Sequence, residues 1–511
     1  MDSMHDVDVL IAGAGPAGLT AALHLARRGV RVRLVDAKSG PATTSRSLNT
    51  HARTLELYDQ LGVLGDLAPF GTRVHALVRH LPHGPVRVEY AYDGLATRFP
   101  YMFMVDQVIT ERVLRGHAAA HGAPVEWGTA LDSFTQDEDG VRARLAGPAG
   151  TETVRARYLW GCDGGHSTVR KALGLPLEGE TAHNWLIVDA RIDGPALARD
   201  AIHWLFPPGG AVLLFPFPDP GKWRLLDTGG QGDPGRPELI AARFGARIGQ
   251  ALGVPVAVEE PAWVSAFTAQ QRAVPTMRVG RCFVSGDAAH VHSPASGQGM
   301  NVSIQDAHNL AWKLAMVVRG EAHPALLDTY TAERLPVGRA LLATTRQVAE
   351  TAMVATTAED APGSDHPFLR RLVRDMSGLG LHYADSPLTL GSGDGPGPRP
   401  GERLTQVDAA DADSPGWTLL RAALREPTWH LLVFGPSPAV PATLPSWLRA
   451  HRITPGGTTD PDLTLHRVLG GAEGDWILVR PDGYLAARGD RFDGATIDRF
   501  LDRLAAPPLA S

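Results

Sequence analysis

The stretch VDVLIAGAGPAGLTAALHLARRGVRVRLVDA, residues 7–37, constrains the fold of this chain more than any other part of the sequence. Its residue pattern predicts a strand that ends near Ala12, a helix over about residues 16–28 and a second strand over residues 30–35. Strand, helix and strand in this order form a βαβ unit. We therefore expect an α/β fold with a parallel sheet.

The turn between the strand and the helix reads GxGxxG, and each glycine has a physical reason. Gly13 permits the tight turn, Gly15 lets the backbone approach a pyrophosphate, and Gly18 lets helix and strand pack closely. The helix start also offers free N–H groups to an anion. A glycine turn used only for packing is the alternative. The dinucleotide interpretation assigns the residues Gly13, Ala14, Gly15, Pro16, Ala17, Gly18, Asp36 and Ala37.

Asp36 favours the dinucleotide interpretation because it follows the second strand about twenty residues after the turn. A carboxylate there accepts hydrogen bonds from ribose hydroxyls and disfavours a 2′-phosphate. The resident dinucleotide is therefore expected to be FAD or NAD.

Composition excludes several classes of protein. The net charge is −6, and the chain has no run of Lys and Arg with interleaved aromatic residues of the kind that binds nucleic acid. No stretch approaches the roughly 20 apolar residues that a membrane-spanning helix needs. The two cysteines, Cys162 and Cys282, form no CxxC, and the N-terminal region is acidic where a secretory signal is basic. We expect a cytoplasmic protein without nucleic-acid or membrane partners.

Three further blocks contain polar residues at the starts of helices or loops. Arg46 lies in a polar loop, and Gln107 lies in the first turn of a helix over about residues 106–121. Asp163 ends a strand and precedes two glycines. Each is compatible with an ordinary surface or loop role, or with a contact to a cofactor.

The block GDAAHVHSPASGQGMN, residues 286–301, follows a strand and leads into an amphipathic helix that begins near Gly299. Its two histidines, His290 and His292, lie close to Asp287 and raise the possibility of a metal site. No third ligand with suitable spacing is evident, so we expect no metal.

The middle of the chain, residues 182–273, changes to short alternating strands with Pro/Gly turns, which predicts an inserted and mostly antiparallel sheet. Such a sheet can line an apolar pocket. The candidate lining residues, each of which is also a candidate core residue, are Trp204, Phe206, Phe215, Phe217 and Trp223.

The last part of the chain predicts a small α/β domain after a Gly/Pro-rich linker over residues 388–404. We expect a strand at HLLVFG, a helix over 446–451, strands over 463–469 and in WILVRPDGYLAAR, and a closing helix over 495–504. Before the linker, Pro336 is expected to end or kink a long helix.

Taken in order, these blocks resemble the single-component FAD-dependent aromatic hydroxylases of the para-hydroxybenzoate and phenol hydroxylase class. The resemblance covers residues 6 to about 345 and rests on GAGPAGL, SRS, DQVITERVL, CDGGHSTVRKALG and GDAAHVHSPASGQGMN. The C-terminal part resembles the thioredoxin-like appendage of the polyketide hydroxylase branch, which usually lacks redox cysteines.

The resemblance implies a role for each matched residue. Arg46 and Gln107 correspond to positions near the flavin, and Asp163 to an acid that supports both FAD and the pyridine nucleotide. Asp287, after Gly286, corresponds to the acid that holds the ribityl chain, and Pro294 to the residue beside the reactive flavin carbon. The helix start under the pyrimidine ring corresponds to Gly297, Gln298, Gly299, Met300 and Asn301.

The resemblance also implies a domain division. An FAD-binding domain covers residues 1–181 and 274–388, and a substrate-binding β-sheet domain covers 182–273 with parts of 71–105. A thioredoxin-like domain covers 400–511.

By resemblance, NADPH or NADH visits transiently and reduces FAD, and O2 adds at the flavin C4a carbon as a hydroperoxide. Its distal oxygen then passes to a phenolic or polycyclic aromatic, polyketide-type substrate. The protein would be a monomer or a homodimer. The sequence nominates no catalytic base. The alternatives are Baeyer–Villiger oxygenation on the same scaffold and a flavin-fold protein that binds an aromatic ligand without turnover.

Overall fold

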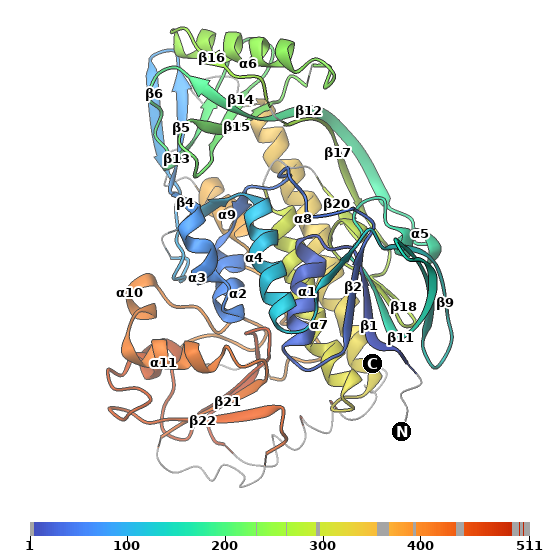
Figure 1. Cartoon of the computed structure of the whole chain (residues 1–511). Coiled ribbons are helices and arrows are strands. Elements are labelled where there is room, and N and C mark those ends of the chain that lie inside the picture. The colour runs from blue at the N-terminus through green and yellow to red at the C-terminus, as the bar shows by residue number, and fades with distance from the viewer. Residues whose placement is uncertain are drawn as a thin grey trace.

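Four sheets organise the part of the chain that the computed structural model describes (Figure 1). The structure describes residues 5–92, 94–230, 232–261, 263–292, 297–354, 367–391, 395–435, 444–492, 500 and 504. Within these residues, no helix is both long and apolar enough to span a lipid bilayer. The mixed α/β fold predicted from the sequence is confirmed.

The first sheet is built around β1 (Val7–Ala12), which is almost wholly buried. It pairs in parallel with β2 (Val32–Asp36) on one side and β11 (Gly150–Gly161) on the other. This is the parallel arrangement that the βαβ pattern predicts. The other strands of this sheet are β8 (Val125–Trp127), β9 (Ala130–Gln136), β10 (Val141–Gly147), β18 (Arg278–Val279) and β19 (Cys282–Val284).

Helices α1 (Pro16–Ala26) and α7 (Gly299–Val318) pack against each other beside this sheet. Every residue from Met300 to Val317 is buried, because α7 is enclosed by other elements on all sides. Helix α8 (Asp328–Val354) continues through Pro336, so of the two expected effects of this proline, an end or a kink, the end is wrong. The other α-helices of this region, apart from those that accompany the second and C-terminal sheets, are α2 (Ala52–Leu61), α3 (Leu64–Leu67), α4 (Gln107–Ala120), α5 (Thr168–Ala172) and α9 (Pro367–Ser377).

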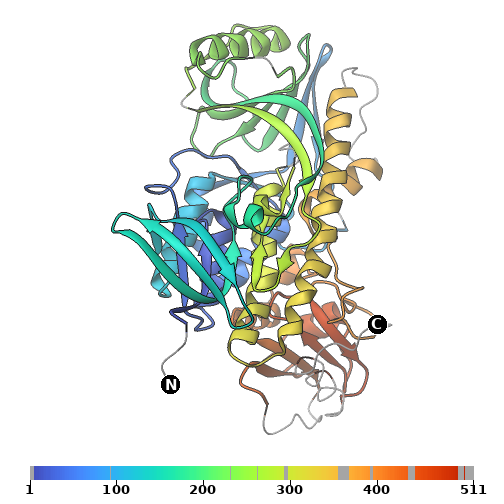
Figure 2. The same cartoon turned by 90° about the vertical axis from the view of Figure 1, so that its right-hand side faces the viewer.

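The second sheet contains two long strands, β12 (Glu178–Asp193) and β17 (Trp263–Ala273), which run antiparallel to each other. In Figures 1 and 2 they extend from the region of the first sheet to the far end of the molecule. Helix α6 (Pro237–Leu252), which the sequence analysis did not anticipate, covers one face of this sheet. The other strands are β5 (Ala76–Leu81), β6 (Gly84–Glu89), β13 (Ala201–Leu205), β14 (Val212–Pro216), β15 (Lys222–Asp227), β16 (Ala257–Val258) and β20 (His290–Val291).

A small sheet of three strands joins the two large ones. Strand β7 (Met102–Val105) pairs on its two sides with β3 (Asn49–Thr50) and β4 (Gly71–Val74). All four residues of β7 are buried, so this sheet lies inside the molecule.

The C-terminal sheet has the strand order β22-β21-β23-β24. Its central strand β21 pairs in parallel with β22 and antiparallel with β23, which is consistent with the predicted thioredoxin-like fold. The elements of this part are α10 (Ala409–Ala412), α11 (Pro415–Ala423), β21 (Trp429–Phe434), β22 (Leu448–Ile453), α12 (Thr464–Leu469), β23 (Trp476–Val479) and β24 (Leu485–Gly489).

Two short C-terminal elements differ from the sequence prediction. The predicted helix over residues 446–451 is mostly strand β22, because this segment pairs along its length with the buried strand β21. The predicted strand over 463–469 is helix α12, whose first turn is capped by Asp460 through the backbone N–H groups of Leu465 and His466. The predicted closing helix over 495–504 falls mostly outside the described residues.

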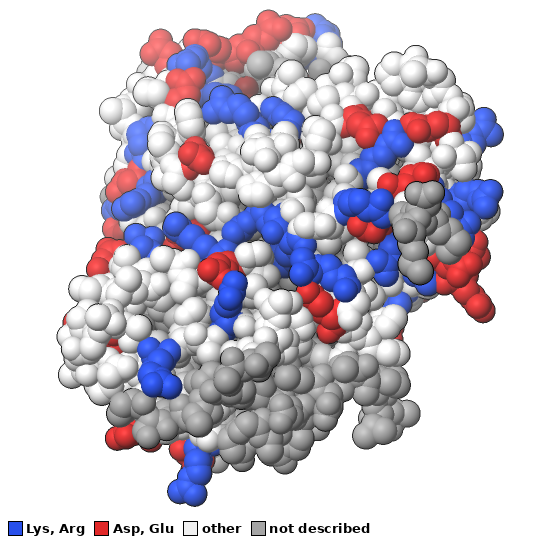
Figure 3. All heavy atoms as spheres, turned by 60° about the horizontal axis from the view of Figure 1, so that its bottom comes forward, with Lys and Arg blue, Asp and Glu red and all other residues white. Residues whose placement is uncertain are grey.

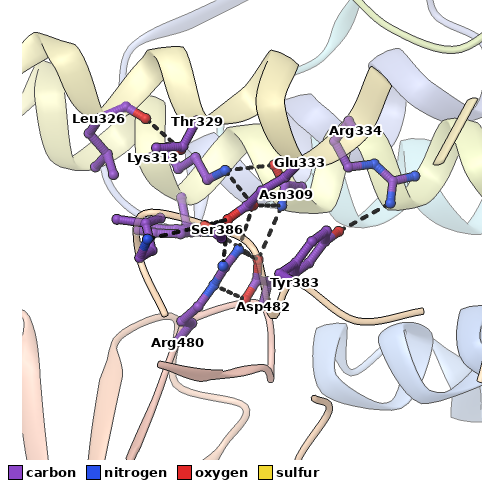
Figure 4. Close-up of polar contacts among 12 residues, drawn as sticks. Asn309, Lys313, Leu326, Thr329, Glu333, Arg334, Tyr383, Ser386, Arg480 and Asp482 are labelled. Carbon is purple, nitrogen blue, oxygen red and sulfur yellow. Dashed lines mark hydrogen bonds and ion pairs between the residues drawn. The ribbon is translucent and has the colours of Figure 1, made fainter. Parts of the chain in front are cut away.

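The C-terminal part is fixed to the helices by a buried ionic network (Figure 4). Arg480, in the turn after β23, donates to both carboxylate oxygens of Glu333 on α8 at 2.7 and 2.8 Å. Lys313 of α7 donates to the same carboxylate at 2.7 Å, and Asp482 accepts from Arg480 at 2.6 Å. All four side chains are at most 1 % exposed. We name these four residues the 480 network.

Candidate functional site

A cavity lies where the carboxyl ends of β1, β11 and β19 meet the second sheet. This is the edge at which open α/β sheets bind their ligands. The cavity contains about 1270 Å³ of space, part of it open to solvent. The predicted residues that line it are Gly15, Pro16, Ala17, Arg46, Gln107, Asp287, Gly297, Gly299 and Met300.

The glycine turn has little space for side chains except toward the cavity. Gly13 has a φ of +103°, and a Cβ there would lie 2.3 Å from the carbonyl oxygen of Cys162. At Gly18 a Cβ would lie 1.9 Å from the Gly13 oxygen, whereas at Gly15 it would meet nothing within 4 Å. Because no side chain of the described residues caps α1, its first N–H groups face the cavity unpaired.

Asp36 and Ala37 lie behind this turn rather than in the cavity lining. The Asp36 carboxylate accepts from the backbone N–H of Ala14 at 2.8 Å and from that of Lys38 at 2.9 Å. It therefore fixes the shape of the glycine turn, and its half-buried position leaves it accessible at the end of β2.

The start of α7 forms the opposite end of the cavity. Gly297 has a φ of +61°, and a Cβ on it would lie 2.6 Å from the amide nitrogen of Asn49. Asn301 accepts from the backbone N–H of His51 at 2.9 Å and donates to the Asn49 carbonyl at 3.0 Å. These contacts hold the first turn of α7 against β3. Pro294 lies outside the described residues.

Gln298 and Gly286 support this end from behind. The Gln298 side chain donates to the carbonyl of Asp375 on α9 at 2.9 Å. The backbone N–H of Gly286 donates to Asp306 of α7 at 3.1 Å. Both residues lie outside the cavity lining and connect the GDAAHVHSPASGQGMN block to neighbouring helices.

A buried acid organises the polar groups beneath the block. Asp306 accepts from His290 at 2.7 Å and from Arg334 at 2.8 Å. Burial alone would raise the pKa of Asp306, but the Arg334 guanidinium and then His290 outweigh it and hold this pKa below its usual value. His290 is therefore a structural partner of Asp306.

His292 is the second histidine of this block, and it lines the cavity. A Cβ on Gly299 would lie 2.5 Å from its ring, so the imidazole packs directly on the start of α7. No group of three or more His, Cys, Asp or Glu side chains is arranged to hold a metal ion in the described part of the chain.

Arg46 and Gln107 approach the cavity from a third side. The backbone N–H of Gln107 donates to the Ser45 hydroxyl at 3.1 Å, and its side chain donates to Glu111 at 2.7 Å. Burial raises the pKa of Glu111, and the hydrogen bond from Gln107 opposes this shift. Arg46 is exposed at the cavity and is available to a ligand.

Asp163 has a local structural role. Its carboxylate accepts from the Ser167 hydroxyl and from the backbone N–H groups of Thr168, at 2.7 Å, and Val169, at 3.2 Å. The acid therefore caps the short helix α5 and does not line the cavity.

Sequence reasoning missed Arg224, which lies on β15 and lines the cavity on the side of the second sheet. Its guanidinium pairs with Asp189 of β12 at 2.8 and 2.9 Å and donates to the Ser45 carbonyl at 2.7 Å. The side chains of this pair are 8 and 7 % exposed. The sequence does contain a signal for this residue, namely an arginine between Trp223 and Leu225 in a strand of alternating pattern. Because successive side chains of a strand point to opposite faces, Arg224 lies on the face opposite the apolar core.

The rest of the cavity wall that the second sheet forms is apolar. Ile187, Phe215 and Leu226 line the cavity beside Arg224. Of the five aromatic candidates, only Phe215 is in the lining. Trp223 and Phe217 belong to the core, and Trp204 stacks on Phe206 at 5.3 Å between ring centroids.

Comparison with known proteins identifies the family. Residues 6–345 match the model of a family described as an FAD-binding domain. The 6-methylpretetramide 4-monooxygenase of Streptomyces rimosus is 46 % identical, over 98 % of this chain and 94 % of that protein. The structure of an aklavinone-11 hydroxylase with FAD and aklavinone superposes with a TM-score of 0.77 at 28 % identity, over 99 % of both chains.

The anhydrotetracycline hydroxylase OxyS from Streptomyces rimosus has a TM-score of 0.74 and 29 % identity, over 99 % of this chain and 100 % of that one. The matches extend beyond the cofactor region and include the C-terminal sheet. The chain belongs to the FAD-binding family of flavin-dependent monooxygenases.

Proposed function

We propose that the cavity binds FAD in an extended form and that the enzyme hydroxylates a polycyclic aromatic substrate against the second sheet. One observation supports this most directly. A single cavity joins the glycine turn at Gly15, the start of α7 at Gly299 and the apolar wall at Phe215. It therefore offers continuous space from an anion site to an aromatic site.

The groups present fit FAD at both ends. The uncapped start of α1 and the open space at Gly15 suit a pyrophosphate. In this proposal the half-buried Asp36 accepts from a ribose hydroxyl. The uncapped start of α7 suits a flavin ring whose reduced form carries negative charge. In this proposal Asp287 accepts from the ribityl hydroxyls, and Arg46 and Gln107 contact the flavin side.

Bound FAD supplies the redox chemistry: it takes reducing equivalents from NADPH or NADH and activates O2 for transfer of one oxygen atom. The chain contributes binding, orientation and exclusion of water. Arg224 uses Nε and Nη2 for its hydrogen bonds to Asp189 and Ser45, which leaves Nη1 for the substrate. A positive charge there stabilises a phenolate oxygen, which makes the ring more electron-rich.

The names of the relatives suggest which substrates to assay first. They include 6-methylpretetramide, anhydrotetracycline and aklavinone. The wall formed by Ile187, Phe215 and Leu226 suits flat aromatic rings of this kind. The domain division given above and a monomer or homodimer as the solution state are part of the same proposal.

The test is a screen for substrate-stimulated oxidation of NADPH and NADH by the FAD-loaded protein. We expect faster NAD(P)H oxidation with a polycyclic phenol, and a product heavier by one oxygen with all rings intact. A product in which a ring ketone has become an ester would indicate Baeyer–Villiger chemistry instead. Tight binding of the aromatic compounds without turnover would contradict the proposed activity and support a binding protein.

A further inference from the structure

A second hollow lies at the seam between the C-terminal part and the helices, remote from the flavin site. It is formed by the C-terminal ends of α1 and α7, near Arg28 and Arg319, and by the loops around Thr428 and Trp447. The cavity described above lies at the opposite ends of the same helices. Since α7 has 20 residues, the two sites are about 30 Å apart. We name this hollow the seam pocket.

Arg28 is the most unusual residue in the seam pocket. It is 9 % exposed, yet no carboxylate among the described residues lies within 4 Å of its guanidinium. Its hydrogen bonds, both from Nη1, go to the ring and the carbonyl of His24 at 3.0 Å. Burial and then the nearby Arg27 lower the pKa of Arg28 to about 9, and Asp482 opposes this shift. A buried cation without a counter-ion is costly.

A second, independent feature points to a ligand. Thr428 also lines the seam pocket, and its hydroxyl oxygen is buried and has no hydrogen-bond partner among the described residues. Buried hydroxyl groups are nearly always hydrogen-bonded. The hollow therefore contains both an uncompensated positive charge and an unused hydrogen-bond donor.

The surroundings of the seam pocket are basic and aromatic. Arg27 and Arg319 lie at its sides, and the single acid in its lining, Glu321, is paired with Arg319 at 2.8 Å. The partly buried Trp447 adds a flat apolar surface. Figure 3, which brings the lower end of Figure 1 forward, shows Lys and Arg side chains in a band across this face. The local charge contrasts with the net charge of −6 of the whole chain.

Stabilisation of helix ends explains only part of this arrangement. Basic residues at the C-termini of helices interact favourably with the helix dipole. Arg27 and Arg319 fulfil this role, because they donate to the carbonyls of Leu61 and Arg28 at 3.2 and 3.0 Å. That role requires a charge near the helix end and accounts neither for the burial of Arg28 nor for the unpaired hydroxyl of Thr428.

We propose that the seam pocket binds a small oxyanion, a phosphate or a carboxylate carried by a flat ring, with Arg28 as its counter-ion and Thr428 as a donor. The hollow contains about 690 Å³ of space, part of it open to solvent, and its lining combines charged, polar and aromatic side chains. Such a ligand would contact both α7 and the C-terminal part. This inference goes beyond the proposed function, since the seam pocket is too remote from the flavin site to take part in oxygen transfer.

The test uses the FAD-loaded full-length protein, so that the flavin site is occupied. Titration calorimetry with inorganic phosphate, adenosine 5′-monophosphate and benzoate is compared with sodium chloride at the same ionic strength. We expect saturable binding of one anion per chain. Tighter binding of adenosine monophosphate than of benzoate would identify the phosphate ester as the ligand class, and the reverse order would identify the aromatic carboxylate.

Two variants connect this binding to the pocket. Arg28→Met should weaken the best anion at least tenfold, and Thr428→Val should weaken it several-fold with little change in shape. Without anion, Arg28→Met should be no less stable than the wild type, because a buried charge is replaced by an apolar side chain of similar length. Arg236→Met, an exposed arginine on the remote α6 side, is the matched control and should bind like the wild type.

Binding that is no stronger than with chloride, or an Arg28→Met variant that binds the anion as tightly as the wild type, would overturn the proposal. Should Arg28→Met fail to fold, Thr428→Val alone decides: unchanged affinity in that variant contradicts the site. Substrate-stimulated NAD(P)H oxidation is measured in parallel and should be retained in both variants. A failure of the anion site is thereby distinguished from a failure of the proposed function.

Discussion

Replacement of Glu333 by Gln is the sharpest test of how the C-terminal part is held. The carboxylate accepts from Lys313 and Arg480, and also from Asn309 at 2.6 Å and Ser386 at 2.5 Å. Gln keeps the shape but removes the charge and turns one acceptor into a donor. Removal of one partner of a buried pair typically costs about 3–5 kcal/mol. We expect a loss of this size in the free energy of unfolding at pH 7.

The loss should depend on pH with a defined sign. Burial lowers the pKa of Lys313 to about 8 even though Glu333 opposes the shift, and loss of Glu333 should lower it further. The folded state then binds fewer protons than the unfolded state, in which the pKa of lysine is about 10.4. Stability of the variant relative to the wild type should therefore increase as the pH rises from 7 to 9.

Urea unfolding followed by circular dichroism at pH 7, 8 and 9 measures both effects. Glu238→Gln is the matched control, since Glu238 forms an exposed pair with Arg236 and should change stability by less than about 1 kcal/mol. A Glu333→Gln variant within about 1 kcal/mol of the wild type at pH 7, or an equal loss at pH 7 and pH 9, would refute the argument.

Three further predictions concern the site and the C-terminal sheet. Asp287→Ala should weaken FAD binding about 10–100-fold in fluorescence titrations, because a hydrogen bond to a charged group contributes roughly 1.5–3 kcal/mol; unchanged affinity would contradict the ribityl assignment. Arg224→Met should lower kcat/KM for the aromatic substrate about 10–100-fold and increase peroxide release, with partial recovery in Arg224→Lys; equal activity in all three proteins would contradict its role. Burial, and then the neighbouring His451, lower the pKa of His430 to about 4. His430 should therefore contribute stability above pH 6.5 that is lost as the pH falls toward 4. Thermal unfolding of His430→Asn should accordingly show a smaller decrease over this interval, and an identical decrease would exclude the histidine.

Local patterns in the sequence predicted the elements that surround the cofactor. GAGPAG and the residues around Gly299 lie at helix starts, where glycine positions and free N–H groups follow from a few neighbouring residues. Asp106 likewise caps α4 by accepting from the N–H of Val108 at 3.0 Å, and aspartate is a residue type typical of this position before a helix. Such signals are local because a turn or a cap is completed within about five residues.

Other features depend on contacts that a single sequence does not reveal. The bond from Arg224 to the Ser45 carbonyl joins residues 179 positions apart. The types of the six-residue elements β22 and α12 were predicted wrongly because short segments of mixed apolar and polar residues suit either structure until their pairing partners are known. Pro336 was expected to end or kink its helix, yet α8 continues past it to Val354.

The side chains on the two faces of the second sheet have different roles. Along β15, Trp223 and Leu225 pack in the core with α6, whereas Arg224 and Leu226 face the cavity. A substitution at a cavity-facing position thus leaves the packing on the other face intact. Mutation and selection can change the shape of the substrate wall without rebuilding the scaffold. Relatives of this chain are named for compounds as different as pentachlorophenol, rifampicin and aklavinone. The alternate positions of β15 are therefore the first choice for redirecting substrate preference.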